Sequence, residues 1–119
     1  MATVRYLVSD VAKAIAFYEN LGFDLEDRML PAFARMRRFD LDLWIAGPGS
    51  SAARPLADDR QPRPGGWNRF VIEVDQLEFF IEDLHGVTVR HEIVSGPGGR
   101  QVLIEDPDGN VVELFEARR

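Results

Sequence analysis

Two acidic residues stand where a carboxylate could do chemistry. Glu113 and Asp42 each lie between two apolar residues, in a short run with the character of a β-strand. Because side chains alternate along a strand, such a carboxylate points either to the wet face of a half-buried sheet or into a site. For either acid taken alone, the wet face is the simpler interpretation.

The two histidines are further candidates for proton chemistry. His91 shares a strand face with apolar residues of the run 87–94. One interpretation is a hydrogen-bonded histidine in the core or at its rim. The alternative is an acid or base near Arg69 and Glu113, because imidazole has a reference pKa of about 6.5. His85 stands at the predicted end of a helix, where capping is favoured over catalysis.

Each half of the chain predicts a strand, a helix and three further strands. In the first half, Asp10 can cap a helix over 11–21, and Gly22 fits the left-handed position after it. In the second half, a helical apolar stripe runs between a capping Asp75 and a terminating Gly86. The predicted strands are 4–8, 23–30, 33–39 and 41–46, then 68–74, 87–94 and the two arms of a hairpin over 101–116.

The hairpin contains the clearest turn signal of the chain, Asp106-Pro107-Asp108-Gly109. Aspartate suits the first position of a tight turn, proline the second and glycine the fourth. The turn brings the strand that carries Glu113 back beside the strand that precedes it.

The two halves are internal repeats. Arg5-Tyr6-Leu7-Val8 resembles Arg69-Phe70-Val71-Ile72, and Asp42 falls on the position of Glu113. The sequence therefore predicts an α+β fold of two βαβββ modules, about 1–47 and 68–119, in a single domain. The modules' concave sheets would form a cavity. Two acids at equivalent positions favour a shared cavity over two exposed side chains. Carboxylates in one cavity need a counter-charge, so Arg69 is expected to pair with Glu113, and Asp42 is a further candidate partner.

The segment 48–67 between the modules has a different composition. From Gly47 to Trp67 it holds four glycines and four prolines in 21 residues, which excludes a helix or a central strand. A connection of this length is either a flexible linker or a functional lid or arm.

Composition excludes several classes of function. The 119 residues contain no cysteine, so disulfides and thiolate metal sites are ruled out. No apolar run is long enough to span a membrane, and no signal peptide is evident, so a cytoplasmic location is expected. The net charge of −6 argues against nucleic acid and favours a cationic partner.

Two motifs resemble the vicinal oxygen chelate superfamily, the glyoxalase, bleomycin-resistance and extradiol dioxygenase group. They are Phe17-Tyr18 with Leu21-Gly22-Phe23, and the closing Asp106-Pro107-Asp108-Gly109-Asn110 with Glu113-Leu114. The resemblance covers the chain apart from the linking segment. It implies paired βαβββ modules, and two chains in a homodimer.

The resemblance also implies where a metal would bind. Metal-dependent members place a histidine on the first strand of each module and an acid on the last. Glu113 and Asp42 match the acid positions and are the candidate ligands, but the histidine positions fall on Thr3 and Arg69. Threonine is a poor ligand and arginine a permanent cation, so no metal cofactor is expected.

Three functions remain open. The first is a metal-free protein that binds a small amphipathic ligand. The second is an enzyme of the same superfamily, a lyase, isomerase or dioxygenase, using a metal or an acid–base pair such as Glu113 with His91. The third is a dimeric structural or regulatory module. For the ligand site, the candidate residues are Arg69, Asp42, Glu113, Trp44, Phe70, Phe115, Trp67 and His91.

Overall fold

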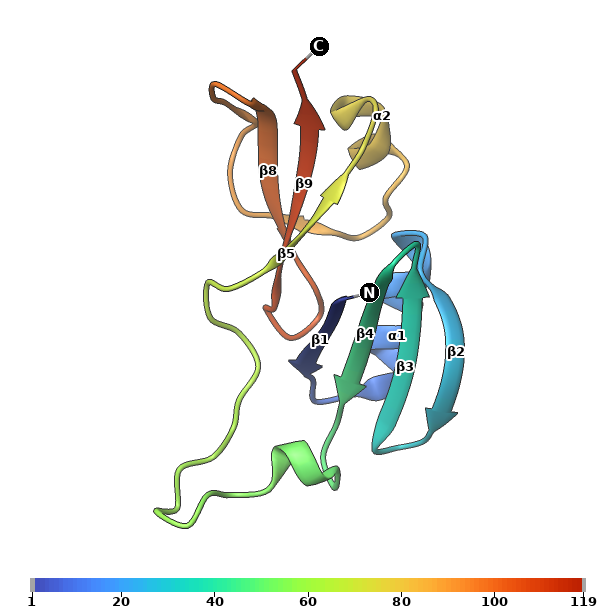
Figure 1. Cartoon of the computed structure of the whole chain (residues 1–119), viewed down its shortest axis with the longest axis vertical. Helices are drawn as coiled ribbons and strands as arrows, with labels where there is room; N and C mark the ends of the chain where they lie inside the picture. Colours follow the sequence, from blue (N-terminus) through green and yellow to red (C-terminus); the bar gives the residue numbers. More distant parts are fainter. Residues whose placement is uncertain (1, 119) are drawn as a thin grey trace. The chain divides into compact units, whose positions relative to one another are not determined.

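The computed structural model describes residues 2–118, which divide into two compact units. The first unit extends to Gly65 and the second begins at Gly66, inside the predicted linking segment. Each unit holds one sheet with one α-helix (Figure 1). The α+β class is therefore confirmed, and the two units are described in turn.

The first unit has the predicted order of strand, helix and three strands. Its sheet order is β1-β4-β3-β2, with β1 parallel to β4 and the other pairs antiparallel. The short 3-10 helix η1 follows the sheet. The elements are β1 (Ala2–Leu7), α1 (Val11–Asn20), β2 (Asp24–Met29), β3 (Phe33–Arg38), β4 (Leu41–Ala46) and η1 (Ser51–Ala53).

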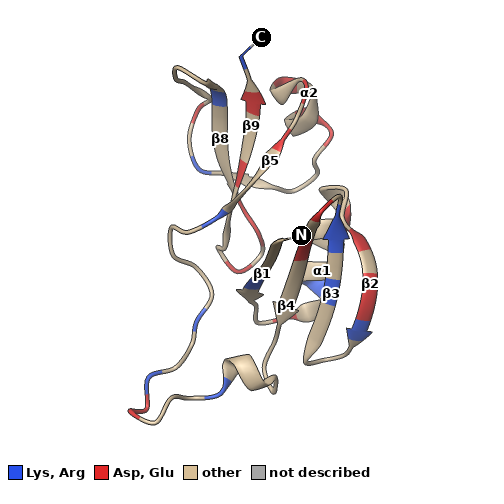
Figure 2. Ribbon diagram, viewed as in Figure 1, with Lys and Arg blue, Asp and Glu red and all other residues tan. Residues whose placement is uncertain are grey.

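The two faces of this sheet differ in chemistry. One face packs against α1 and is fully apolar at its centre, where Ala34, Met36, Leu43 and Ile45 are buried. The alternation of β3 and β4 places their polar and aromatic residues on the opposite face, which α1 leaves open. Basic segments of β3 lie beside acidic segments of β2 (Figure 2). By this alternation, Arg35, Arg37 and Asp42 lie on the open face.

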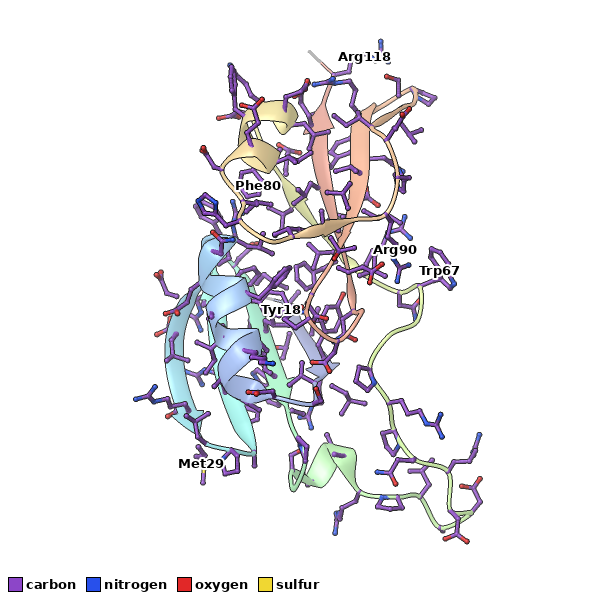
Figure 3. All side chains as sticks on the ribbon, turned by 180° about the vertical axis from the view of Figure 1, so that it is seen from behind. Tyr18, Met29, Trp67, Phe80, Arg90 and Arg118 are labelled. Carbon is purple, nitrogen blue, oxygen red and sulfur yellow. The ribbon has the colours of Figure 1, made fainter. Side chains whose placement is uncertain are left out.

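Helix α1 forms as its local sequence predicts. Asp10 Oδ1 accepts a hydrogen bond from the backbone N–H of Lys13 at 3.1 Å, so the predicted N-cap is confirmed. Tyr18, on the buried side of the helix, is fully buried (Figure 3). It makes an edge contact with Phe23, with 5.6 Å between ring centroids. Gly22 follows at φ +96°, a conformation that favours glycine.

The second unit repeats this plan with a shorter helix and a broken strand. Its sheet order is β5-β9-β8-β6, and β7 also pairs with β8. Its elements are β5 (Phe70–Glu73), α2 (Leu77–Glu82), β6 (Thr88–Val89), β7 (Val94–Ser95), β8 (Gly99–Glu105) and β9 (Val111–Ala117). Within residues 2–118, no helix has the length and apolar character needed to cross a membrane.

The predicted N-cap of the second helix is wrong. The N-cap position belongs to Gln76, not Asp75, and its side chain makes no capping bond. The backbone N–H of Leu77 instead donates to Glu116 Oε1 at 2.8 Å. The cap is therefore supplied by β9, an element 39 residues further along the chain.

The end of this helix also differs from the prediction. Helix α2 ends at Glu82, so His85 lies beyond its last turn and does not cap it. Gly86 does adopt the expected left-handed backbone, at φ +66°, but within the connection to β6. The helix is shorter because the chain turns away through Leu84, whose N–H donates to the Ile81 carbonyl.

The predicted strand 87–94 is interrupted. β6 pairs Val89 with Ile104, and β7 pairs Val94 with Gln101. The chain advances five positions from Val89 to Val94 but only three from Gln101 to Ile104, so two extra residues must leave the ladder. His91 lies in this interruption, and its predicted place on a continuous strand face is wrong.

The turn at 106–109 is confirmed and tightly bonded. The Gly109 N–H donates to the Asp106 carbonyl at 3.0 Å, and Gly109 has φ +81°. Asp106 Oδ1 accepts the backbone N–H groups of Asp108 at 3.0 Å and Asn110 at 2.8 Å. Asn110 Nδ2 donates to Asp106 Oδ2 at 2.9 Å, so two buried polar side chains satisfy each other.

The segment after β4 is not wholly irregular. Residues Ser51–Ala53 form η1, which corrects the expectation that no helix occurs there. Ser50 Oγ donates to the Gly47 carbonyl at 2.7 Å and fixes the entry to this turn. Residues 54–61 are exposed, as expected for a segment rich in proline and glycine.

Candidate functional site

The two acids occupy corresponding places in the two sheets. Asp42 on β4 lies beside Thr3 of β1, and Glu113 on β9 lies beside Val71 of β5. Both acids are on the face away from the helix, yet each is only 8% exposed. A carboxylate buried to this degree needs a partner, because an unpaired buried charge is costly.

An arginine supplies that partner in each unit. Arg69 Nε and Nη2 both lie 3.0 Å from Glu113 Oε1, which confirms the predicted pairing. Asp42, which the sequence also allowed as a partner of Arg69, has its own arginine. Arg37 Nε donates to Asp42 Oδ1 at 3.2 Å from the neighbouring strand β3. Each unit therefore contains one pair of a buried carboxylate with a guanidinium group.

The positions next to the acids offer no imidazole. Thr3 is the β1 neighbour of Asp42, as the alignment to the family predicts. By strand register the β5 neighbour of Glu113 is Val71, so the alignment of Arg69 with this position is corrected by two residues. Among the described residues, no group of three or more His, Cys, Asp or Glu side chains could hold a metal ion.

Trp44 is the centre of a second cluster on the open face of the first sheet. The register places Arg5 of β1 and Arg35 of β3 on either side of it. The Arg5 guanidinium carbon lies 5.1 Å from the indole centroid. Arg35 Nε and Trp44 Nε1 are buried donors with no hydrogen-bond partner. A buried donor that lacks any acceptor generally costs about 1–3 kcal/mol.

A small pocket is lined by Leu7 and Ala46, each two positions beyond Arg5 and Trp44 on the same strands. It has a volume of about 320 Å³ and lies where β1 and β4 end, between Leu7 and Ala46. Three prolines of the following segment, Pro48, Pro62 and Pro64, help to line it. Its wall is mainly apolar, so it suits an apolar group of a ligand.

The remaining aromatic candidates do not form one wall. Phe70 is on the helix face of its sheet, paired with Val112, so its prediction as a ligand contact is wrong. Phe115 alternates to the open face, which it shares with Glu113. Trp67 is 70% exposed and stacks with Arg90, whose guanidinium carbon is 4.7 Å from the ring centroid (Figure 3).

His91 has local contacts only. Its Nδ1 lies 2.6 Å from the carbonyl oxygen of Glu92, so this nitrogen is the donor of the pair. The side chain is half-buried in the loop between β6 and β7. Its role as an acid or base stays a prediction.

A different ionic cluster holds the second helix on its sheet. Arg100 Nη2 donates to both oxygens of Glu78 and lies 2.9 Å from Glu116 Oε1. The hydrogen bond from Arg100 lowers the pKa of the Glu78 carboxyl, and its bonds to Glu78 and Glu116 raise the pKa of Arg100. A pocket of about 390 Å³ lies here. Because these groups satisfy one another and cap α2, we assign the cluster a structural role.

Sequence reasoning missed three arginines of the open face, Arg5, Arg35 and Arg37. The signal was available in β3, where apolar residues alternate with arginines from Phe33 to Arg38. When β3 and β4 are aligned as an antiparallel pair, Arg35 lies opposite Trp44 and Arg37 lies opposite Asp42.

Comparison with known proteins identifies the family. The model of the Glyoxalase/Bleomycin resistance protein/Dioxygenase superfamily matches residues 1–114. The chain belongs to this superfamily. No curated protein matches the sequence.

Solved structures of the superfamily share the fold. A member from Sphaerobacter thermophilus is 26% identical, with a TM-score of 0.76, over 98% of this chain and 95% of that one. TnmS3, an antibiotic binding protein from a Streptomyces species, is also 26% identical, with a TM-score of 0.73 over 98% and 93%. A lactoylglutathione lyase from Agrobacterium tumefaciens, at 22% identity, TM-score 0.73 and 98% and 92% coverage, shares the fold.

Proposed function

We propose that this protein binds a small organic ligand on the open faces of its sheets, without the metal site of its superfamily. The observation that carries the proposal is the arginine bound to each acid, Arg37 to Asp42 and Arg69 to Glu113. A carboxylate held by a guanidinium is oriented for recognition, and its charge is already compensated.

Electrostatics disfavours a metal at these acids. A divalent ion beside Glu113 would lie a few ångströms from the Arg69 guanidinium. At an effective dielectric near 20, the repulsion is on the order of several kcal/mol. A metal would also have to replace an existing ion pair, and neither Thr3 nor Val71 adds a strong ligand.

A relative supports binding rather than catalysis. TnmS3 is an antibiotic binding protein and matches 98% of this chain at 26% identity. The apolar pocket of about 320 Å³ lined by Leu7 and Ala46 has the size of the smaller ligand sites in proteins. Both observations favour an amphipathic small molecule.

The test is calorimetric titration of the metal-stripped protein with Ni²⁺, Zn²⁺ and Fe²⁺. We expect no sub-micromolar binding, and no difference between the parent and a Glu113→Gln variant. Asp42→Asn is the matched variant for the first unit. Tight binding that either substitution abolishes would overturn the metal-free proposal and promote the enzyme alternative.

The enzyme alternative has its own requirement. Without a metal it needs an acid–base pair such as Glu113 with His91. Here Glu113 is bound by Arg69, and His91 Nδ1 is bound by the Glu92 carbonyl. Glu113 would have to be released from Arg69 before it could exchange a proton with a substrate, so we rank binding first.

We further propose that two chains form a homodimer. The open faces leave apolar side chains uncovered, including Val71 at 51% and Met29 at 71% exposure. Pairing with a second chain would bury such surface. Light scattering at several concentrations should give twice 13.5 kDa, whereas a monomer at every concentration would contradict the proposal.

A further inference from the structure

The Arg5, Trp44 and Arg35 side chains form one row across three neighbouring strands. Arg5 pairs with Trp44 in the parallel register of β1 and β4, and Trp44 pairs with Arg35 in the antiparallel register of β4 and β3. The side chains of register partners lie on the same face of a sheet. Two guanidinium groups therefore flank one indole on the open face of the first unit.

This row differs from the next one, where Arg37 is neutralised by Asp42. Within the described part of the chain, neither Arg5 nor Arg35 forms an ion pair. Asp27 is the register partner of Arg35 on β2, but its Oδ1 accepts the backbone N–H of Arg28 at 2.8 Å. The positive charge of the row is thus not compensated by a contact with the neighbouring acid.

Two of the donors in the row also lack an acceptor. Arg35 Nε and Trp44 Nε1 are both buried, and neither donates a hydrogen bond. Buried donors of folded proteins are almost always paired, so this pair is an exception that requires an explanation. A bound carboxylate offers two oxygen acceptors for these two donors, and its negative charge would complement Arg5 and Arg35.

The surroundings of Trp44 indicate the rest of the molecule. Phe33 meets the indole edge-on, with 6.2 Å between centroids, and its register partner Ala46 lines the apolar pocket with Leu7. A molecule with its charge at Arg35 can therefore place an apolar body along Phe33 and into this pocket.

We propose that the open face of the first unit binds an organic anion, an aromatic or other apolar body carrying a carboxylate, with its two oxygens at Arg35 Nε and Trp44 Nε1. This inference rests on the proposed binding function and names the class of ligand. It reverses the expectation from the net charge of −6, because Asp42, the buried acid of the neighbouring row, is already paired with Arg37. Arg5, which is exposed and lies over the indole, is the side chain that moves to admit the ligand.

The test compares three probes of one shape: 2-naphthoate, 2-naphthamide and 2-naphthylmethylammonium. The chain has two tryptophans, so its ¹⁵N spectrum has two indole N–H signals, Trp44 and the exposed Trp67 as internal control. We expect 2-naphthoate to shift the Trp44 signal and leave that of Trp67 in place. Its affinity should exceed that of the amide about tenfold or more, because bonds to a charged acceptor are the stronger kind.

Single substitutions distinguish the effect of the two unpaired donors on binding from the effect of the overall positive charge. Arg35→Gln should weaken 2-naphthoate about tenfold and change 2-naphthamide by less than twofold, whereas Arg28→Gln on the edge strand should change neither beyond the effect of salt. Trp44→Phe keeps a smaller aromatic ring and removes the indole donor. If Arg35→Gln fails to fold, the probe series on the parent protein still decides the question.

Two results would overturn the inference in distinguishable ways. Equal affinity for the three probes, with the Trp44 signal shifted by all of them, would contradict the anion preference and leave the binding function intact. A Trp44 signal unmoved by every probe would reject this site, and would count against the proposed binding function as well.

Discussion

Replacing Arg69 with methionine tests whether burial, rather than distance, determines how much an ion pair contributes to the stability of this protein. The Arg69 side chain is 30% exposed and that of Glu113 is 11% exposed. Loss of one partner of a fully buried pair costs about 3–5 kcal/mol, and loss of an exposed pair less than about 1 kcal/mol. With one partner near a third exposed, we expect Arg69→Met to lower the free energy of unfolding by about 2 kcal/mol.

The matched control is the ion pair of Arg60 with Asp58. Its atoms are closer, at 2.6 Å against 3.0 Å, but its side chains are 78% and 53% exposed. If distance decided the energy, Arg60→Met would be the more destabilising change. Because water screens the exposed pair, we expect this change to cost less than about 0.5 kcal/mol.

Urea unfolding followed by circular dichroism measures the loss of stability in both variants. At a slope of about 2 kcal/mol per molar, Arg69→Met should lower the midpoint by about 1 M and Arg60→Met by less than about 0.3 M. A double-mutant cycle with Glu113→Gln isolates the coupling, because the second change removes the charge that the first leaves unpaired. Equal costs for the two arginines, or a coupling near zero, would refute the argument.

Three further predictions follow from other parts of the structure. Gly99→Ala should cost roughly 2–4 kcal/mol, because the added Cβ would lie 2.1 Å from the backbone oxygen of Glu116, whereas Gly96→Ala, with its nearest neighbour at 4.0 Å, should be nearly neutral in the same assay. Since the Glu78 pKa is lowered in the folded state, its contribution to stability is present above the unfolded pKa and is lost as the pH falls through and below about 4.5; Glu78→Gln should therefore show a smaller acid loss of stability than the parent, and identical acid profiles would contradict the Arg100 contact. Amides of residues 54–61 should exchange with deuterium much faster than those of Phe70–Glu73, because this exposed segment lacks ladder bonds; equal protection would count against it.

Local features of the chain were predictable because their causes lie within a few residues. The Asp10 cap acts on an N–H three residues away, and the Asp106 to Asn110 turn is closed by its own side chains. The alternation of Leu41–Ala46 gave the bounds of β4 correctly. In each case a short-range hydrogen bond or a fixed side-chain period specifies the structure.

The internal repeat also allowed one long-range contact to be predicted. Laying the halves on each other aligned Asp42 with Glu113, and a buried acid near Arg69 requires a counter-charge. The ion pair between Arg69 and Glu113 follows from that requirement and is present, across 44 positions of sequence. The need of a buried carboxylate for a counter-charge, not proximity in the chain, made this contact predictable.

Other contacts depended on register and could be known only from the tertiary structure. Whether Asp42 pairs with Arg37 or another arginine is decided by which residues β3 and β4 bring opposite each other. The capping of α2 by Glu116, rather than by the nearby Asp75, depends on where β9 passes the helix. The break at His91 arises because the five positions from Val89 to Val94 face only three positions of β8, from Ile104 to Gln101.

The sequence by itself therefore determined the elements apart from η1 and the break between β6 and β7, their order in each module and the chemistry of the acid positions. These depend on propensity, periodicity and turn geometry. Only the tertiary structure decided which face each residue occupies where the pattern is ambiguous, as for Phe70, and which donors remain without an acceptor, as for Trp44 and Arg35. The physical reason is that one residue of slip in a strand moves every side chain to the other face, and a single sequence pattern does not fix the register between strands.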